Sequence, residues 1–219
     1  MVLKSRKHVF WEALLMTLVV FVLGLLIGVA FEANRLDKIN EYYAQSEISL
    51  MDLFVLNNLV NQDADCSVLI DSHIVFADRI YEEASLMEKY QQAGRLSSNI
   101  KLAHQRYDLI RTFLWINIEK TMERCSEEGE FNSVVYLYEY EPKDLAQKAT
   151  QGVWSKVLFD LKQAEGGNIL LIPIAVNTGV ASTEAMASRF KIVNYPVVVV
   201  NSKHVLSDLV SAEDISKLL

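Results

Sequence analysis

Cys66 and Cys125 are the only two thiols in the sequence, and any sulfur chemistry of the chain depends on them. Redox-active pairs normally lie close together in the sequence at the start of a helix, where one thiol has a lowered pKa. These two lie far apart, and a zinc site would need further ligands beside them. The spacing therefore favours a structural disulfide over two alternatives, a pair of unpaired buried thiols and a redox-active pair.

Glu139, Glu141 and Asp144 are the acid–base candidates that lie closest together. They come just before an expected helix, and the free N–H groups and dipole of a helix start stabilise acidic side chains. That structural role accounts for them, so we assign no catalytic residue, no metal site and no cofactor. The loop Asn177-Thr178-Gly179 follows an expected strand, at an edge where α/β sheets often bind ligands, but it fits an ordinary turn.

The elements that position the cysteines are two expected helices. Residues 68–92 and 100–124 both place apolar side chains at helical spacing, and "AGRLSS" between them combines a helix stop with serine caps. Facing residues of an antiparallel hairpin have a constant sum of positions, so pairing the two cysteines centres the turn between Arg95 and Leu96. That point falls inside AGRLSS. The sequence therefore predicts a helical hairpin closed by a disulfide, with His73 opposite residue 118.

An apolar segment, residues 13–31, precedes the hairpin and carries no charge. As a helix it is roughly 28 Å long, close to the hydrocarbon thickness of a bilayer. Lys4, Arg6 and Lys7 come before it, which predicts a cytoplasmic N-terminus and an extracytoplasmic remainder. A cleaved signal peptide is the rival interpretation, because residues 28–30 are small, but signal cores are usually shorter.

Charge and glycine spacing limit the partners of the chain. Residues 32–219 contain 18 basic and 27 acidic side chains, which argues against a nucleic-acid binder because such proteins need a basic face. Gly24 and Gly28 are one turn apart, which would let a second helix approach closely in a homo-oligomer, although glycine is frequent in membrane helices generally. From Glu32 to about Asn61 the pattern stays helical and extends the apolar segment into a stalk.

The period of the pattern changes after the hairpin. Strands are predicted over residues 134–140, 169–176, 197–200 and 205–209, and helices over 143–163, 182–191 and 211–219. Pro142 suits the first turn of the first of these helices, and Ser182 and Ser211 suit caps. The apolar run at 169–176 is typical of a strand in the buried middle of a sheet.

The order βαβ, α, ββα over residues 131–219 resembles the thioredoxin fold. Its most specific piece is "RFKIVNYPVVVVNSKHVLSDL", in which a helix end, an X-Pro pair, a strand, a turn and a second strand follow one another. The resemblance implies a cis bond before Pro196, beside the helix that starts near Pro142, and a Tyr195 backbone that can pair with an extended peptide.

The motif that carries the chemistry of that family is absent. "YEYEPKDLAQ" stands where a C-x-x-C would be, and no thiol follows Cys125. Thiol–disulfide exchange needs an attacking thiolate, so this domain is expected to be redox-inactive.

We therefore expect an α/β protein in three parts. Residues 1–31 form a cytoplasmic tip and transmembrane signal anchor, residues 32–128 a stalk and disulfide-closed hairpin, and residues 129–219 a thioredoxin-like domain without C-x-x-C. This whole-chain arrangement also resembles that of archaeal membrane proteins.

The expected function is binding rather than catalysis. A single-pass protein of the cell membrane, anchored in the bilayer through residues 13–31, would bind a protein or extended peptide outside the cytoplasm. The surface expected to do so consists of Tyr195, Pro196, Tyr140 and Glu141. One alternative is a membrane-tethered thiol–disulfide oxidoreductase or isomerase that uses Cys66 and Cys125, and another is a scaffold subunit of a membrane complex.

Overall fold

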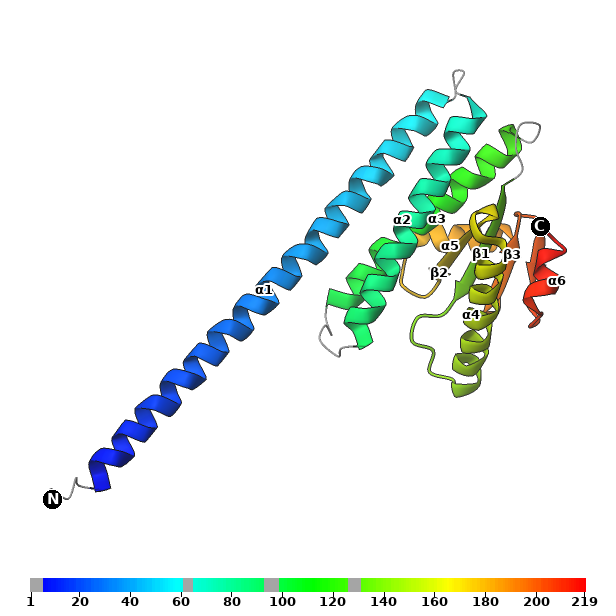
Figure 1. Cartoon of the computed structure of the whole chain (residues 1–219). Helices are drawn as coiled ribbons and strands as arrows, with labels where there is room; N and C mark the ends of the chain where they lie inside the picture. The colour runs from blue at the N-terminus through cyan, green and yellow to red at the C-terminus, as the bar shows by residue number, and fades with distance from the viewer. Residues whose placement is uncertain (1–5, 61–64, 93–98, 126–130) are drawn as a thin grey trace. The chain divides into compact units, whose positions relative to one another are not determined.

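A mixed α/β arrangement is present in the computed structural model, which describes residues 6–60, 65–92, 99–125 and 131–219 (Figure 1). The elements in this part of the chain are α1 (Arg6–Val60), α2 (Cys66–Gln92), α3 (Asn99–Arg124), β1 (Asn132–Tyr138), α4 (Leu145–Glu165), the 3₁₀ turn η1 (Gly166–Asn168), β2 (Ile169–Ala175), α5 (Ala181–Arg189), β3 (Val197–Val200), β4 (His204–Leu206) and α6 (Ala212–Ser216). The chain divides into two units, Met1–Glu47 and Ile48–Leu219.

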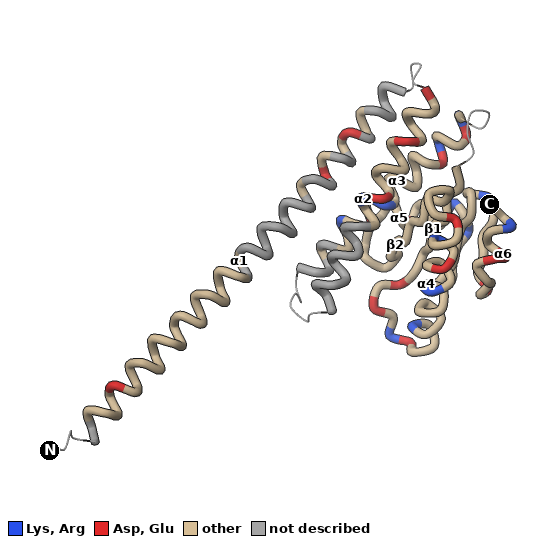
Figure 2. The backbone as a smooth tube through the Cα atoms, viewed as in Figure 1, with Lys and Arg blue, Asp and Glu red and all other residues tan. Residues whose placement is uncertain are grey.

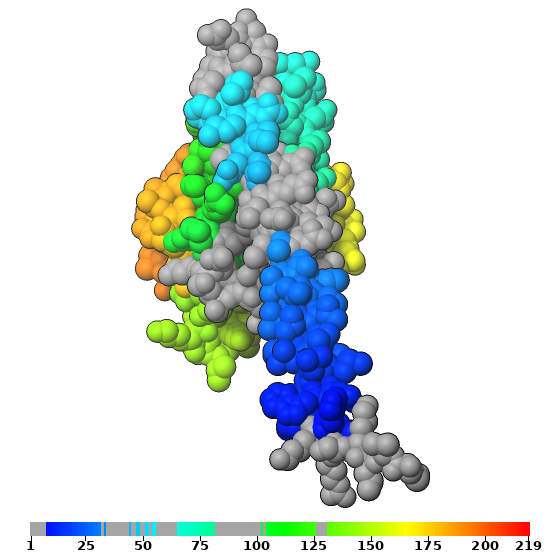
Figure 3. All heavy atoms as spheres, turned by 90° about the vertical axis from the view of Figure 1, so that its left-hand side faces the viewer, coloured from blue at the N-terminus to red at the C-terminus, as the bar shows by residue number. Residues whose placement is uncertain are grey.

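Helix α1 continues without a break from the apolar segment into the expected stalk. Its segment His8–Phe31 has a mean hydropathy of 2.9 and is long and apolar enough to span a membrane. Glu12 is the one Asp, Glu, Lys or Arg in this described segment (Figure 2). The apolar side chains are exposed along the segment, up to 78% for Phe31 (Figure 3). The expected apolar helix is therefore present, with a surface suited to lipid.

Helices α2 and α3 form the predicted hairpin (Figure 1). Cys66 is the first residue of α2 and Cys125 follows α3 directly, and their sulfurs are bonded at 2.01 Å with the Cα atoms 5.7 Å apart. Both cysteines are buried together with Leu69. The predicted disulfide is confirmed. The predicted turn of the hairpin, residues 93–98, lies outside the described residues.

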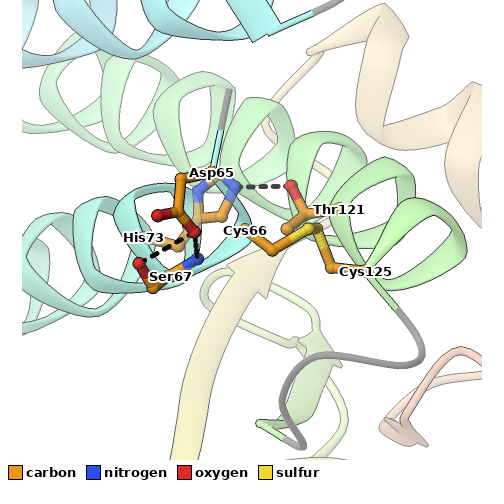
Figure 4. The surroundings of a disulfide bond; sticks show 6 residues. All are labelled: Asp65, Cys66, Ser67, His73, Thr121 and Cys125. Atoms are coloured by element: carbon orange, nitrogen blue, oxygen red, sulfur yellow. Dashed lines mark hydrogen bonds between the residues drawn. A yellow bond between two sulfur atoms is a disulfide. The ribbon is translucent and has the colours of Figure 1, made fainter. Parts of the chain in front are cut away.

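His73 lies nearer the disulfide than predicted. Its Nε2 is 2.9 Å from Thr121 Oγ1, one helical turn before Cys125 (Figure 4). The constant-sum rule fixes the pairing of two helices only to within a turn, because their side chains meet once per turn of 3.6 residues. Asp65 caps the start of α2 by accepting from the N–H and Oγ of Ser67, at 3.1 and 3.0 Å.

The four strands form one sheet in the order β2-β1-β3-β4. β1 pairs in parallel with β2 and antiparallel with β3, and β3 pairs antiparallel with β4. Asn201 and Ser202 both adopt positive φ, 50° and 53°, which makes the β3–β4 turn tight and brings His204 opposite Val200. The second hairpin strand is therefore 204–206 and not the predicted 205–209.

Helices cover both faces of the sheet. On one face α4 and α6 bury a core cluster in which Trp154, Leu158 and Ile215 meet the strand residues Val134 and Val198. Side chains of successive strand residues point to opposite faces, so Val135, Leu137, Ile172, Val197 and Val199, which are also buried, point to the other face. There α3 packs on β2, with α5 beside α3.

Strand β2 lies at an edge of the sheet and not in its middle as the sequence predicted. From Ile169 to Ala175 its residues are nonetheless buried, apart from the half-buried Leu171 and Pro173, because helices cover both of its faces. Pro173, which cannot donate to a strand ladder, suits an edge position. A continuous apolar run thus indicates a strand covered on both faces, whatever its place in the sheet.

Two helix starts also differ from the predictions. α4 begins at Leu145, because Asp144 accepts from the N–H of Ala146 at 3.0 Å and forms the N-cap in place of a first turn at Pro142. α5 begins at Ala181 with Val180 as its N-cap, and Ser182 makes no capping bond. By contrast, Ser211 caps α6 as predicted, by accepting from the N–H of Asp214.

The double variant Cys66→Ser/Cys125→Ser should lower the free energy of unfolding by roughly 4 kcal/mol, because a loop with a sequence separation of 59 is no longer closed in the unfolded chain. Urea unfolding of the full chain in nonionic detergent, followed by tryptophan fluorescence, measures this. A reductant should bring the wild type to the value of the variant and leave the variant unchanged. Equal stability of the variant and the oxidised wild type would contradict a structural role.

Acid should destabilise the fold through His73. Burial lowers the pKa of this imidazole from about 6.5 to about 4. Above pH 6.5 the ring is neutral in both states and its contribution is fully present. As the pH falls towards 4 the unfolded chain takes up a proton that the folded chain does not, and stability is lost.

In His73→Gln, the drop in unfolding free energy between pH 7 and pH 4 should be smaller than in the wild type by about 3 kcal/mol. Urea titrations at both pH values measure this difference. His204→Gln, at an exposed histidine, is the matched control. The same pH dependence in His73→Gln and the wild type would show that His73 does not carry the effect.

Candidate functional site

Two amide side chains hold the loop that follows β1. Gln151 donates from Nε2 to the Glu139 carbonyl at 3.0 Å and accepts at Oε1 from the Glu139 N–H at 3.2 Å. Asn177 pairs with Tyr140 in the same way, donating from Nδ2 to its carbonyl at 2.9 Å and accepting at Oδ1 from its N–H at 2.6 Å. The backbone of both loop residues is therefore satisfied by side chains from α4 and from the loop after β2.

Tyr195 and Pro196 lie beside the first turn of α4. The peptide bond between them is cis, as expected, with Pro196 buried and Tyr195 half-buried. Gln147, in that first turn, donates from Nε2 to the Tyr195 carbonyl at 3.3 Å. The expected proximity of Tyr195 to the amino end of this helix is therefore present.

A cavity of about 680 Å³ lies beside Tyr140, and we call it the Tyr140 groove. It runs past Leu171 and Pro173 of the edge strand β2. Its aromatic lining residues are Tyr81, Tyr136, Tyr138, Tyr140 and Phe159, and its charged ones are Arg111, Glu139, Glu141, Lys148 and Lys162. This volume is within the usual range of small-molecule sites.

The predicted surface residues fall into two neighbouring places. Tyr140 and Glu141 line the Tyr140 groove, and the Tyr140 ring packs on that of His104 with centroids 4.3 Å apart. Tyr195 and Pro196 do not line it. Glu139 is close to both places. It lines the groove. The pKa of Tyr195 is raised by burial first, then by the charge of Glu184, and then by the charge of Glu139.

Asp108 of α3 joins the helical hairpin to the sheet. The residue is fully buried. Its Oδ1 accepts from the N–H of Ala175 and its Oδ2 from Thr178 Oγ1, both at 2.9 Å. Arg111 Nη1 lies 4.0 Å from Oδ1. Burial raises the pKa of Asp108 to about 6, while Arg111 and the two hydrogen bonds act in the opposite direction. The carboxylate is thus held at the end of β2 at neutral pH.

Further polar contacts connect α3 to α5 and to the loop after β2. Thr112 Oγ1 lies 2.7 Å from Thr183 Oγ1 of α5, and Gln105 donates to the Thr178 carbonyl. Arg189 of α5 donates from Nη1 to Glu119 Oε2 at 2.8 Å. Polar groups buried at a helix interface must be paired to be tolerated, so these bonds fix where α3 lies against β2 and α5.

Asp108 and Arg111 were not predicted as site residues, and the loop that contains Thr178 was predicted to be an ordinary turn. A signal was available, since both charged residues fall on the apolar side of the expected helix, close to Tyr107, Ile110 and Leu114, which are buried. Charged side chains on a buried stripe are uncommon unless they are paired. The hydrogen-bond donors to Asp108, however, are the N–H of Ala175 and the hydroxyl of Thr178. Both lie far from α3 in the sequence, so residue spacing does not indicate them.

The cysteines lie at the other end of the sheet from this site. Cys125 lines a second cavity together with Asn132, the first residue of β1, whereas Glu139 and Tyr140 follow its last residue, Tyr138. A seven-residue strand spans about 20 Å. Cys66 and Cys125 are 7% and 2% exposed. The described residues contain no cluster of three or more potential metal ligands.

No match to this chain was found among models of known protein families, curated proteins or solved structures. Its function is therefore inferred from its own geometry.

Asp108→Ala should lower the free energy of unfolding by about 3–5 kcal/mol, because it leaves Arg111 without its counter-charge and the Ala175 N–H and Thr178 hydroxyl without an acceptor. Urea unfolding of the full chain at pH 7 measures this. Asp160→Ala, which removes an exposed carboxylate on α4, is the matched control and should change stability little. A loss below about 1 kcal/mol in Asp108→Ala would refute the role assigned to the carboxylate.

Proposed function

We propose that this chain is a membrane-anchored protein whose extracytoplasmic part has a thioredoxin-like fold without redox activity and binds a protein or an extended peptide. The observation that carries the proposal is the contact of Tyr195 with Gln147 at the amino end of α4. The loop before this helix has no cysteine. A site that keeps the peptide-binding position of a family but lacks its nucleophile is suited to binding.

The sheet supports the fold assignment. A parallel β1–β2 pair, an antiparallel β3–β4 hairpin and a closing helix α6 follow the order that the resemblance implies. The helical hairpin comes before residues 131–219, which carry the resemblance, and covers one face of this sheet.

The backbone of Tyr195 supports peptide binding. Within the described part of the chain its N–H has no hydrogen-bond partner. Its carbonyl accepts one bond, from Gln147, and a carbonyl oxygen has two lone pairs. An extended peptide could therefore exchange a pair of hydrogen bonds with Tyr195 as an added strand does, without displacing Gln147.

The alternative of a thiol–disulfide oxidoreductase requires access to the Cys66–Cys125 disulfide. Burial of both sulfurs and their position at the far end of β1 from Tyr195 favour a structural disulfide. An insulin-reduction assay separates the two functions: activity that serine at either cysteine abolishes would support the enzyme.

The apolar part of α1 supports membrane anchoring. His8–Phe31 as a helix is about 36 Å long, enough for the bilayer core. The basic residues before it favour a cytoplasmic N-terminus, and the disulfide favours an oxidising compartment for the rest. Gly24 and Gly28 have open space where a Cβ would lie, which leaves room for a second helix to approach. A homo-oligomer formed through this face stays a prediction.

Tyr195→Ala should weaken capture of the partner without lowering expression, because the side chain is only half-buried and its loss removes contact area at the proposed site. Photo-crosslinking from the neighbouring exposed position 193 in native membranes, in chains that carry either Tyr195 or Tyr195→Ala, measures this. Leu209→Ala, at another exposed apolar residue, is the control. Unchanged recovery of the crosslinked partner with Tyr195→Ala would remove this surface. A partner that co-purifies in fixed ratio with both proteins would indicate a scaffold subunit instead.

A further inference from the structure

Arg111 is a buried cation for which the described part of the chain offers no hydrogen-bond acceptor. It is 4% exposed. Its Nε is buried and unpartnered, and no described residue accepts a hydrogen bond from its guanidinium group. The ring of Tyr107 lies 5.4 Å from Cζ and offers its π-face. Five N–H donors of a guanidinium are seldom left without acceptors inside a protein.

Asp108 balances the charge of Arg111 but does not satisfy its donors. The separation of 4.0 Å between Nη1 and Oδ1 exceeds hydrogen-bond length. Both carboxylate oxygens already accept from Ala175 and Thr178. The donors of Arg111 are therefore available to a further acceptor, and Arg111 lines the Tyr140 groove.

We propose that the Tyr140 groove binds a small monocarboxylate with an aromatic or apolar body, whose carboxylate pairs with Arg111. A guanidinium fork matches a carboxylate with two parallel hydrogen bonds. Tyr81 and Tyr140 supply aromatic walls on the side of the groove where Arg111 lies, and Leu171 and Pro173 of β2 add apolar surface there. This site goes beyond the proposed function, because Tyr195 and Pro196 take no part in it.

The charges around the groove favour one negative charge over two. Glu139 and Glu141 line it and oppose a dianion, while Arg111 is the one buried cation among its lining residues. Lys162 already donates to the Ile169 carbonyl at 2.9 Å. His104, whose Nε2 is buried and unpartnered, lies in the same lining and gives the ligand a second polar contact.

The test uses the full chain in nonionic detergent and benzoate as the probe, with benzamide as its neutral isostere. Isothermal titration calorimetry at pH 7 should show saturable binding of benzoate and at least tenfold weaker binding of benzamide, since charge-assisted hydrogen bonds are the stronger kind. Arg111→Met should weaken benzoate binding about tenfold or more. Arg106→Met, at an exposed arginine of the same helix, should leave it unchanged.

Photolabelling keeps the proposal testable if Arg111→Met does not fold. In the wild type, 4-azidobenzoate should label the peptide that contains Tyr138, Tyr140 and Pro142, and excess benzoate should suppress the label. Absence of benzoate binding at millimolar concentration, equal binding of benzamide, or labelling outside the groove would overturn the proposal. Tighter binding of phenyl phosphate than of benzoate would overturn the assignment to a monocarboxylate.

Discussion

The hydrogen bonds of the buried Asp108 carboxylate are the constraint on which the arrangement of the helical hairpin and the sheet depends. A buried carboxylate is costly unless hydrogen bonds and an opposite charge compensate it. Here the compensation comes from Ala175 at the end of β2, from Thr178 in the loop after it, and from Arg111 one turn further along α3. The carboxylate is thus favourable in one register of α3 against β2, because a shift by one turn would separate it from the Ala175 N–H and the Thr178 hydroxyl.

This register has consequences at both ends of α3. Towards its end, the disulfide ties α3 to α2, so that the hairpin moves as one piece with the sheet to which Asp108 joins it. Towards its start, His104 meets Tyr140, and Arg111 is brought to the groove. The hairpin is therefore a wall of the candidate site, and not a spacer between an anchor and a separate binding domain.

The helices and the disulfide of the hairpin could be predicted from the sequence, and the polar contacts between α3 and the end of β2 could not. Periodicity indicated the helices. The pairing of Cys66 and Cys125 could be predicted because both lie at the same distance from the AGRLSS turn, and the two arms of an antiparallel hairpin start from that turn. The edge position of β2 was missed because a strand covered on both faces has the same apolar run as a central one. Asp108 was missed because its partners are a backbone N–H and a hydroxyl about 70 residues away, with separations of 67 and 70.

The amide pairs in the loop after β1 are one reason why we propose binding for this site. Many catalytic loops use free backbone N–H groups to stabilise charge that develops on the substrate in the transition state, but those of Glu139 and Tyr140 are already bonded to Gln151 and Asn177. The same hydrogen bonds fix the backbone of Glu139 and Tyr140, which lie between Tyr195 and the Tyr140 groove. Rigid walls lower the entropic cost of binding. A loop that is fixed by amides, and that carries no thiol, therefore fits the two binding surfaces that we propose on either side of it.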